Sequence, residues 1–198
     1  MNTNIATLPQ NGPQTKPLKI FRAFTPRLRV IPLGGNGEIG KNMMIYEYGD
    51  DIIIVDCGMM FPRGEMLGVD FVIPNISYLE ERKDKIRGII FTHGHEDHIG
   101  AIPYIWPKLP SPIYATKLTA GFIEAKMKEF SQNPQIRVVR AGDKIQLGCF
   151  KIEFIPFSHT FLDDVGLAID TPEGLVLHIA DFKIDPSKIE SPKIIQKL

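Results

Sequence analysis

The chain has 198 residues, of which 43% are hydrophobic and 23% charged, and its formal net charge is zero. This length suffices for one domain with a substantial core, and the composition is typical of a soluble globular protein. The balanced charge excludes a basic field over the whole surface, although it permits a local basic face for nucleic acid. No apolar run approaches the roughly 18 residues of a membrane span. Since no secretory segment is recognisable either, we expect a cytoplasmic protein without membrane contact.

The N-terminal segment differs in composition from the rest. The first 37 residues contain no Asp or Glu but five basic side chains, and residues 1–17 are rich in Pro, Asn and Gln. We therefore predict a disordered basic arm over residues 1–26 and a folded domain over residues 27–198. A plain solubilising tail is the favoured role for the arm. The alternatives are a contribution to RNA or DNA affinity and an organelle transit peptide, and the lack of serine argues against the latter.

From about Arg27, short apolar runs alternate with turns rich in Gly, Pro and Asp. The runs predict strands, and three segments between them have the spacing of helices. The predicted strands are 27–33, 42–48, 51–55, 88–92, 113–115, 136–139, 144–145, 150–157, 166–170 and 175–179, and the predicted helices are 76–85, 103–109 and 117–130. Strands at both ends with helices between them indicate an α+β fold with helices covering sheets. The two cysteines, Cys57 and Cys149, lie beside strands and are predicted as buried free thiols, with a disulfide as the alternative.

Four polar residues lie one or two residues past the ends of predicted strands. Asp56 comes after strand 51–55, and His93, His159 and Asp181 each follow a later strand. Side chains at the ends of several strands can converge on one rim of a rigid scaffold, where functional sites are built.

The run His93-Gly-His95-Glu-Asp97-His98 contains three histidines and an aspartate within six residues. Imidazole nitrogen and carboxylate oxygen are ligands that suit zinc and manganese. The spacing lets His93 and His95 face one ion while Asp97 and His98 face its neighbour. We therefore predict a site for two divalent metal ions, with zinc as the first expectation and manganese as the alternative. Such a pair suits hydrolysis of a phosphodiester, and equally of a thioester or an amide.

Four further residues receive roles relative to this motif. His159 and Asp181 are predicted to complete the ligand set, although each in isolation would more often be a satisfied polar turn. Asp56 is predicted to hold a ligand histidine in its metal-binding tautomer, with direct ligation as the alternative. His178 lies inside a predicted strand and is predicted to be a packed strand histidine.

Residues 35–41, Gly-Asn-Gly-Glu-Ile-Gly-Lys, satisfy a G-x-G-x-x-G pattern and most of a P-loop. A P-loop requires Ser or Thr after the lysine, where this chain has Asn42. Both nucleotide-binding loops also need a helix to begin at the last glycine, whereas residues 42–48 are predicted as a strand. We therefore predict a tight structural turn beside the metal site.

With these residues in place, the chain resembles the metallo-β-lactamase superfamily, and within it the ribonuclease J group of β-CASP nucleases. The superfamily motif H-x-H-x-D-H is intact at residues 93–98, and Asp56, His159 and Asp181 match its other motif positions. More specific to ribonuclease J are the segments 33–42, 68–74, 92–101 and 159–181. The resemblance spans residues 27–185 and implies an αββα sandwich, of which this chain would be the N-terminal half.

Position by position, the resemblance implies that His159 joins His93 and His95 on one metal ion. Asp181 would bridge to a second ion, which residues 97–98 would hold. It also implies that Asp97 is catalytic and orients or deprotonates the attacking water. The implied reaction is RNA hydrolysis, as endonuclease and 5′-to-3′ exonuclease, in mRNA decay and rRNA maturation. The implied substrate is 5′-monophosphorylated single-stranded RNA, and the implied full-length form is a homo-oligomer.

The chain departs from the family pattern in two places. Residues 159–164 read His-Thr-Phe-Leu-Asp-Asp where the family has His-Ser-Ile-Pro-Asp-Ser, and Ala180 replaces a glycine. Neither change removes a ligand, but both can reshape the site. The family continues through the β-CASP domain and back into the lactamase fold, and that continuation supplies the RNA-binding cleft and a further histidine ligand. Two alternatives therefore stay open: another hydrolase of the same fold, and a non-catalytic truncated module that binds metal or RNA.

Overall fold

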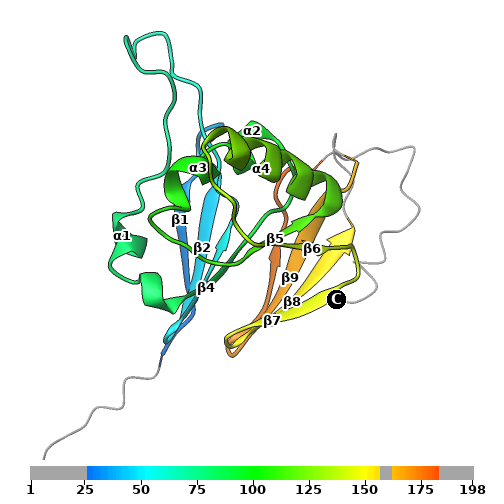
Figure 1. The fold of residues 1–198 in the computed structure, drawn as a ribbon. Coiled ribbons are helices and arrows are strands. Elements are labelled where there is room, and N and C mark those ends of the chain that lie inside the picture. The colour runs from blue at the N-terminus through cyan, green and yellow to red at the C-terminus, as the bar shows by residue number, and fades with distance from the viewer. Residues whose placement is uncertain (1–25, 157–161, 183–198) are drawn as a thin grey trace, which may run out of the picture.

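The structure is a computed structural model, and it describes residues 26–156 and 162–182 (Figure 1). The strands form two sheets, one six-stranded with the order β1-β2-β3-β4-β5-β6 and one four-stranded with the order β10-β9-β8-β7. The strands are β1 (Arg29–Gly34), β2 (Met43–Tyr48), β3 (Asp51–Val55), β4 (Ile86–Ile90), β5 (Ile113–Thr116), β6 (Ile136–Val139), β7 (Lys144–Leu147), β8 (Phe150–Pro156), β9 (Val165–Thr171) and β10 (Gly174–His178). The helices are α1 (Ser77–Glu80), the 3-10 turn η1 (Lys83–Lys85), α2 (Glu96–Ile99), α3 (Ile102–Ile105) and α4 (Lys117–Glu129).

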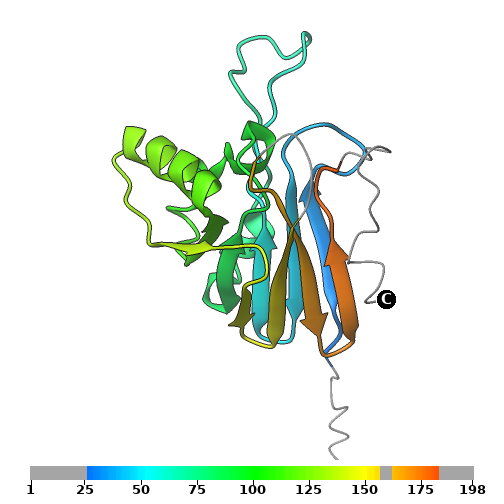
Figure 2. The ribbon, with the colours of Figure 1, turned by 90° about the vertical axis from the view of Figure 1, so that its right-hand side faces the viewer.

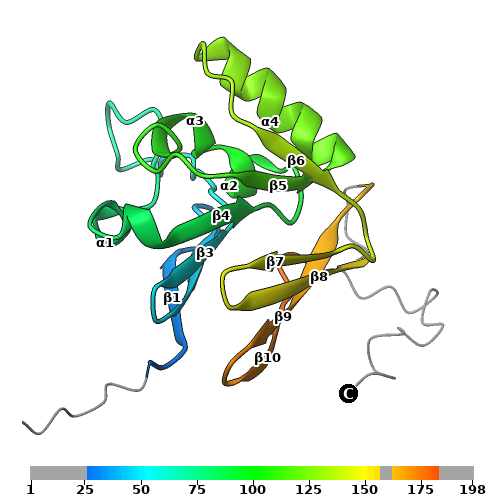
Figure 3. The same cartoon turned by 60° about the horizontal axis from the view of Figure 1, so that its bottom comes forward.

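The first sheet is mixed and the second is antiparallel. Strands β1, β2 and β3 form an antiparallel meander, and β4, β5 and β6 continue it in parallel. The second sheet is built from the sequential hairpins β7–β8, β8–β9 and β9–β10. Figure 3 shows the two sheets facing each other, with the helices on the far side of the first sheet. The predicted α+β class is therefore confirmed.

Strand β3 shows why the first sheet is buried on both faces. Its alternating side chains belong to two separate cores, since successive residues of a strand point to opposite faces. Ile52 and Ile54 pack in the core beneath the helices, which also contains Ile99. Ile53 and Val55 pack in the core between the two sheets. These four side chains of β3 are fully buried, so its continuous apolar run matches a strand covered on both sides.

The layers in the described residues are thus helices, first sheet and second sheet. An outer helix layer on the second sheet, as in the αββα sandwich that the resemblance implies, is not among the residues that the structure describes. The segment between β3 and α1 projects from the sheets (Figure 2), with Met60 and Val72 paired at its base. No helix within 26–156 and 162–182 is long and apolar enough to cross a membrane.

Several element boundaries differ from the sequence prediction. The predicted helix 76–85 is two short turns, α1 and η1, because Arg82 between them leaves helical geometry with φ −130°. Strand β4 begins two residues earlier than predicted and ends at Ile90. It ends there because the backbone N–H of Thr92 donates to the Asp56 carboxylate at 2.9 Å instead of to a strand. A short helix, α2, forms within the histidine motif itself.

The cysteines are both free thiols, as predicted. Cys57 is buried, whereas Cys149 is only half-buried. The arm predicted over residues 1–26 falls almost entirely outside the described residues.

Candidate metal centre

Three of the four polar residues predicted at strand ends meet at one rim of the sandwich. Asp56 follows β3, His93 comes shortly after β4, and Asp181 lies three residues beyond β10. Asp56 and His93 are buried, whereas Asp181 is exposed. The fourth residue, His159, lies outside the described residues. The predicted convergence is therefore confirmed for the part of the set that the structure describes.

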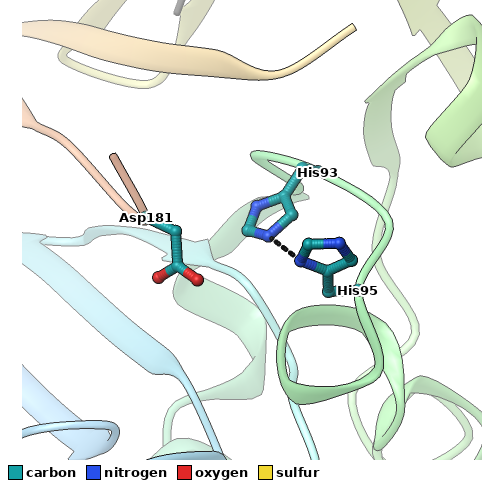
Figure 4. A group of neighbouring side chains, drawn as sticks. All are labelled: His93, His95 and Asp181. Carbon is teal, nitrogen blue, oxygen red and sulfur yellow. Dashed lines mark hydrogen bonds between the residues drawn. The ribbon is translucent and has the colours of Figure 1, made fainter. Parts of the chain in front are cut away.

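Two groups of potential ligand atoms lie at this rim. The ligand atoms of His93, His95 and Asp181 all fall within 4.8 Å of one another, and those of Asp97, His98 and Asp181 do the same. Figure 4 shows the Asp181 carboxylate opposite the two imidazoles of the first group. Asp181 is common to both groups. This division matches the pairing expected from the H-x-H-x-D-H spacing.

The ligand atoms face one another directly. His93 Nε2 lies 2.9 Å from His95 Nδ1 (Figure 4). His98 Nε2 lies 3.5 Å from an Asp181 carboxylate oxygen and 3.7 Å from an Asp97 oxygen. Nitrogen and carboxylate donors at such spacings suit a divalent ion, because two ligands of one metal at about 2.0–2.2 Å stand roughly 3–4 Å apart. The donor set therefore fits the divalent metal ions that the motif predicts.

Asp56 contacts the ring nitrogen of His98 that faces away from the site. Its carboxylate lies 2.8 Å from His98 Nδ1, so that His98 Nε2 faces the site. The other Asp56 oxygen accepts from the backbone N–H of Thr92, and the Thr92 hydroxyl contacts both oxygens. Asp56 itself adopts a left-handed φ of +63°, a conformation that aspartate tolerates better than most residues. The structure thus supplies the contact expected for Asp56, and its role in metal binding stays a prediction.

Burial and charge set opposite pKa shifts in this pair. Burial alone would raise the pKa of Asp56, but the adjacent His98 charge and hydrogen bond bring it below its ordinary value. Burial alone would lower the pKa of His98, and the Asp56 charge and hydrogen bond raise it instead. The two groups therefore stabilise each other as an ion pair or a strong hydrogen bond.

His93 is held in the neutral form. Burial, followed by the nearby charge of His98, lowers the pKa of His93 to about 4. Its Nδ1 lies 3.1 Å from the Thr92 hydroxyl, which leaves Nε2 pointing to the site. A neutral imidazole with one nitrogen turned to the site is the form that binds metal.

The glycine-rich segment 35–41 is a turn, as predicted. Gly35, Gly37, Gly40 and Lys41 have positive φ values of 85°, 75°, 98° and 56°. Strand β2 begins at Met43, so the helix that a nucleotide-binding loop requires is not formed here. The turn leads into Asn42, which contacts Asp97 and His98 of the candidate metal centre.

Asn42, at the end of this turn, is the site residue that sequence reasoning missed. Its side-chain nitrogen lies 3.0 Å from the backbone oxygen of Asp97, 3.2 Å from an Asp97 carboxylate oxygen and 3.0 Å from His98 Nε2. Two sequence signals fall on Asn42, its place at the end of the ribonuclease J-like segment 33–42 and its exclusion of a P-loop, and neither assigned it a contact with the metal ligands. Nothing in the local pattern links residue 42 to residues 97–98.

His178 is a packed strand histidine, as predicted. It lies at the end of β10, and its Nδ1 shares a hydrogen bond of 2.9 Å with the Tyr46 hydroxyl on β2. This contact joins the second sheet to the first beside the metal centre. A cavity of about 380 Å³ opens here, lined among others by Asp56, His98 and Asp181.

The chain belongs to the Metallo-beta-lactamase superfamily, whose sequence profile matches residues 36–181. The matched region contains the turn at Asn42, the H-x-H-x-D-H motif and Asp181. Among solved structures, the metallo-beta-lactamase fold protein YhfI from Bacillus subtilis superposes with a TM-score of 0.55 at 19% identity, covering 82% of this chain and 65% of that one. This similarity shows the shared fold.

The more specific similarity is to ribonuclease J, as the sequence motifs indicated. The chain is 39% identical over 191 residues to Ribonuclease J of Thermus thermophilus, covering 92% of this chain and 32% of the relative. It is 44% identical over 167 residues to Ribonuclease J of Helicobacter pylori, covering 83% of this chain and 24% of the relative. The chain thus spans about a quarter to a third of the length of these relatives.

Proposed function

We propose that this chain carries the metal centre of a two-metal ribonuclease of the ribonuclease J type. One observation carries the proposal most directly: two groups of ligand atoms share the Asp181 carboxylate, which is the arrangement of a bridged metal pair. The similarity to two proteins named Ribonuclease J supports RNA as the substrate.

Each residue has a defined task in this proposal. His93, His95 and, from the sequence motif, His159 would hold one ion, while Asp97 and His98 would hold the other, and Asp181 would serve both. Bound divalent ions supply Lewis acidity and make water a nucleophile near neutral pH. Zinc is the first expectation and manganese the alternative, because both accept these ligands.

Asp97 is the proposed catalytic residue. Its side chain is partly exposed at the rim, with a relative accessibility of 32%, so that it can reach a water molecule next to a bound substrate. A carboxylate there can orient the water or accept its proton. Asp56 acts through His98, whose Nδ1 it holds, and keeps that ring aligned.

The substrate and setting follow from the relatives rather than from the site. We propose 5′-monophosphorylated single-stranded RNA as the substrate, cleaved both internally and from the 5′ end, in RNA decay and rRNA maturation in the cytoplasm. A homo-oligomeric full-length form is part of the same proposal. The similarity to proteins named Ribonuclease J supports RNA as the substrate, and the finer points are those that the family resemblance implies.

Cleavage assays test the proposal with three labelled substrates: 5′-monophosphorylated RNA, the matching 5′-triphosphorylated RNA, and single-stranded DNA. The assays use this chain and the chain extended downstream to the length of its relatives. We expect metal-dependent cleavage of the monophosphorylated RNA, abolished by chelation. Cleavage by the extended protein alone would place the remaining substrate-binding groups downstream. Preference for DNA, or no RNA cleavage by either protein, contradicts the proposal.

The Asp97→Ala variant tests the catalytic assignment. We expect loss of RNA cleavage by a factor of about 10² or more, since a positioned acid or base contributes on the order of 10²–10⁴. Elemental analysis of the same preparation checks whether the first ion is retained. Unchanged cleavage with stoichiometric metal would remove Asp97 from the catalytic role.

A further inference from the structure

Asn42 connects the glycine-rich turn to the proposed second metal position. Its backbone N–H donates to the Asp97 carbonyl oxygen at 3.0 Å, and its own carbonyl accepts from Gly58 N–H at 3.0 Å. Its side-chain nitrogen lies 3.0 to 3.2 Å from three acceptor atoms, two on Asp97 and one on His98. One residue from a distant turn therefore contacts both members of the Asp97–His98 pair.

The orientation of the Asn42 amide is determined by its neighbours. The two nearby Asp97 oxygens can only accept hydrogen bonds, so the amide nitrogen and not the oxygen must face them. The amide oxygen points to the opposite side, against Gly35. A Cβ atom on Gly35 would come within 2.2 Å of it. Gly35, with φ +85°, thus leaves room for the amide in this orientation.

The number of donors and acceptors then leads to a specific role. An amide nitrogen has two hydrogens, whereas three acceptor atoms lie within its reach. A cation bound to His98 Nε2 uses the lone pair of that nitrogen. Two hydrogens then remain for the two oxygens of Asp97, one for each. The contacts of Asn42 are therefore best satisfied when His98 is a metal ligand.

We propose that Asn42 is a positioning residue of the second metal ion, holding the Asp97 carboxylate in the orientation in which it binds that ion. This inference rests on the proposed two-metal function and extends it to a residue that is not one of the predicted ligands. The Asn42 amide nitrogen lies beside both Asp97 and His98, the two residues proposed to hold that ion. Its effect should therefore fall on the second ion and spare the ion held by His93 and His95.

The opposite arrangement would make the Asn42 oxygen a metal ligand itself. That requires the amide to turn over. Its oxygen would then face the two Asp97 oxygens, and its nitrogen would lie against Gly35. The two arrangements predict opposite effects for Asn42→Asp. If Asn42 is a positioning residue, an aspartate in its place presents only acceptors to the oxygens of Asp97, and the affinity for the second ion falls. If Asn42 is a ligand, the same substitution supplies a charged oxygen, and the affinity for the second ion rises.

The experiment is calorimetric titration of Mn²⁺ and Co²⁺ into four proteins: wild type, Asn42→Ala, Asn42→Asp and Asn133→Ala. Asn133 is an exposed residue of the same type in the loop after α4, and it serves as the matched control. We expect Asn42→Ala and Asn42→Asp to lower the affinity for the second ion about 10- to 100-fold, the range found for residues that orient metal ligands. The affinity for the first ion should change less than about twofold, and Asn133→Ala should bind both ions like wild type.

The visible absorption of bound Co²⁺ provides the independent readout. We expect Asn42→Ala to alter the bands that develop with the second equivalent and to preserve those of the first, which a general loss of stability would not do. Thermal unfolding in chelator verifies that each variant is folded. The inference is overturned if both ions lose affinity equally, if the affinity for the second ion is unchanged, or if Asn42→Asp binds that ion more tightly. Absence of any metal binding by wild type instead overturns the proposed function on which it rests.

Discussion

Tyr46 and His178 form a partly buried contact between the two sheets, and the histidine gives it a pH dependence. Burial lowers the pKa of His178, with the charge of His98 acting in the same direction and that of Asp56 against it. The unfolded chain therefore takes up a proton near pH 6.5 more readily than the folded chain. Stability contributed by neutral His178 is present above about pH 6.5 and is lost as the pH falls towards the lowered pKa.

We predict that His178→Asn reduces the acid loss of stability. Its free energy of unfolding should fall less steeply between about pH 7 and pH 5.5 than that of wild type. The difference in slope should correspond to up to about one proton taken up on unfolding. Urea unfolding in chelator at several pH values measures this difference. Tyr46→Phe is the control, since it removes the same hydrogen bond but keeps the titrating ring. Parallel curves for wild type and His178→Asn would show that His178 does not carry the effect.

Asp56 is predicted to matter for both stability and metal binding. In Asp56→Asn, one position that now accepts from Thr92 or faces His98 Nδ1 carries an NH₂ group instead. We expect a loss of about 1–3 kcal/mol in the free energy of unfolding, because a buried hydrogen bond is lost and a donor is left unsatisfied. Affinity for the ion on His98 should fall about 10- to 100-fold. Chemical unfolding and metal titration measure these two quantities, and wild-type values for both would refute the orienting role.

At the level of single residues, the candidate metal ligands could be picked out because three histidines and an aspartate within six residues are typical of a metal site. His93, His95, Asp97 and His98 carry their chemistry in a local pattern. Asn42 does not, since its role arises only when the turn at residues 35–41 folds against α2. Contacts between distant segments of this kind are not encoded in spacing.

At the level of the elements, Gly58 lies against both the end of the glycine-rich turn and helix α2 of the histidine motif. A Cβ atom on Gly58 would lie 1.6 Å from the Asp97 carbonyl oxygen and 2.8 Å from the Asn42 nitrogen. Gly58→Ala must therefore push α2 away from the turn. We expect a loss of about 1–3 kcal/mol or more in the free energy of unfolding, together with weaker binding of the second ion.

Gly121 provides the matched substitution. It lies inside α4, and a Cβ atom there would meet nothing within 4 Å. Gly121→Ala should stabilise the protein by about 0.5–1 kcal/mol, because alanine has the higher helix propensity. Thermal and chemical unfolding of both variants test the pair. Similar effects from the two substitutions would mean that the close approach at Gly58 is not important.

The strands were easier to predict than the short helices. Runs such as 51–55 and 136–139 have boundaries that agree with β3 and β6, because apolar β-branched residues between turns leave little choice. The segment 76–85 was predicted as one helix from its spacing, yet it folds as two turns because tertiary packing prevails over weak local preference. The end of β4 depended on a hydrogen bond to Asp56, which no pattern of strand residues contains.

At the scale of the whole molecule, two cores on opposite faces of one sheet support the rim that carries the candidate metal ligands. The ligand-bearing segments follow β4 and β10, which belong to different sheets. Their relative position therefore depends on the packing between the sheets, where Phe150, Phe154 and Leu167 are buried. The α+β class was predictable from the order of elements, and the sandwich itself from the family resemblance. The pairing of the strands into two sheets came only from the structure.

The central claim is that this chain binds two divalent ions through ligand groups that share Asp181. Equilibrium dialysis against Mn²⁺ or Zn²⁺, followed by elemental analysis, measures it most directly. We predict two ions per chain for wild type, about one for His98→Ala, and weakened binding of both ions for Asp181→Ala. A wild-type chain that binds no ion, or an Asp181→Ala variant that binds both ions as tightly as wild type, would contradict the account.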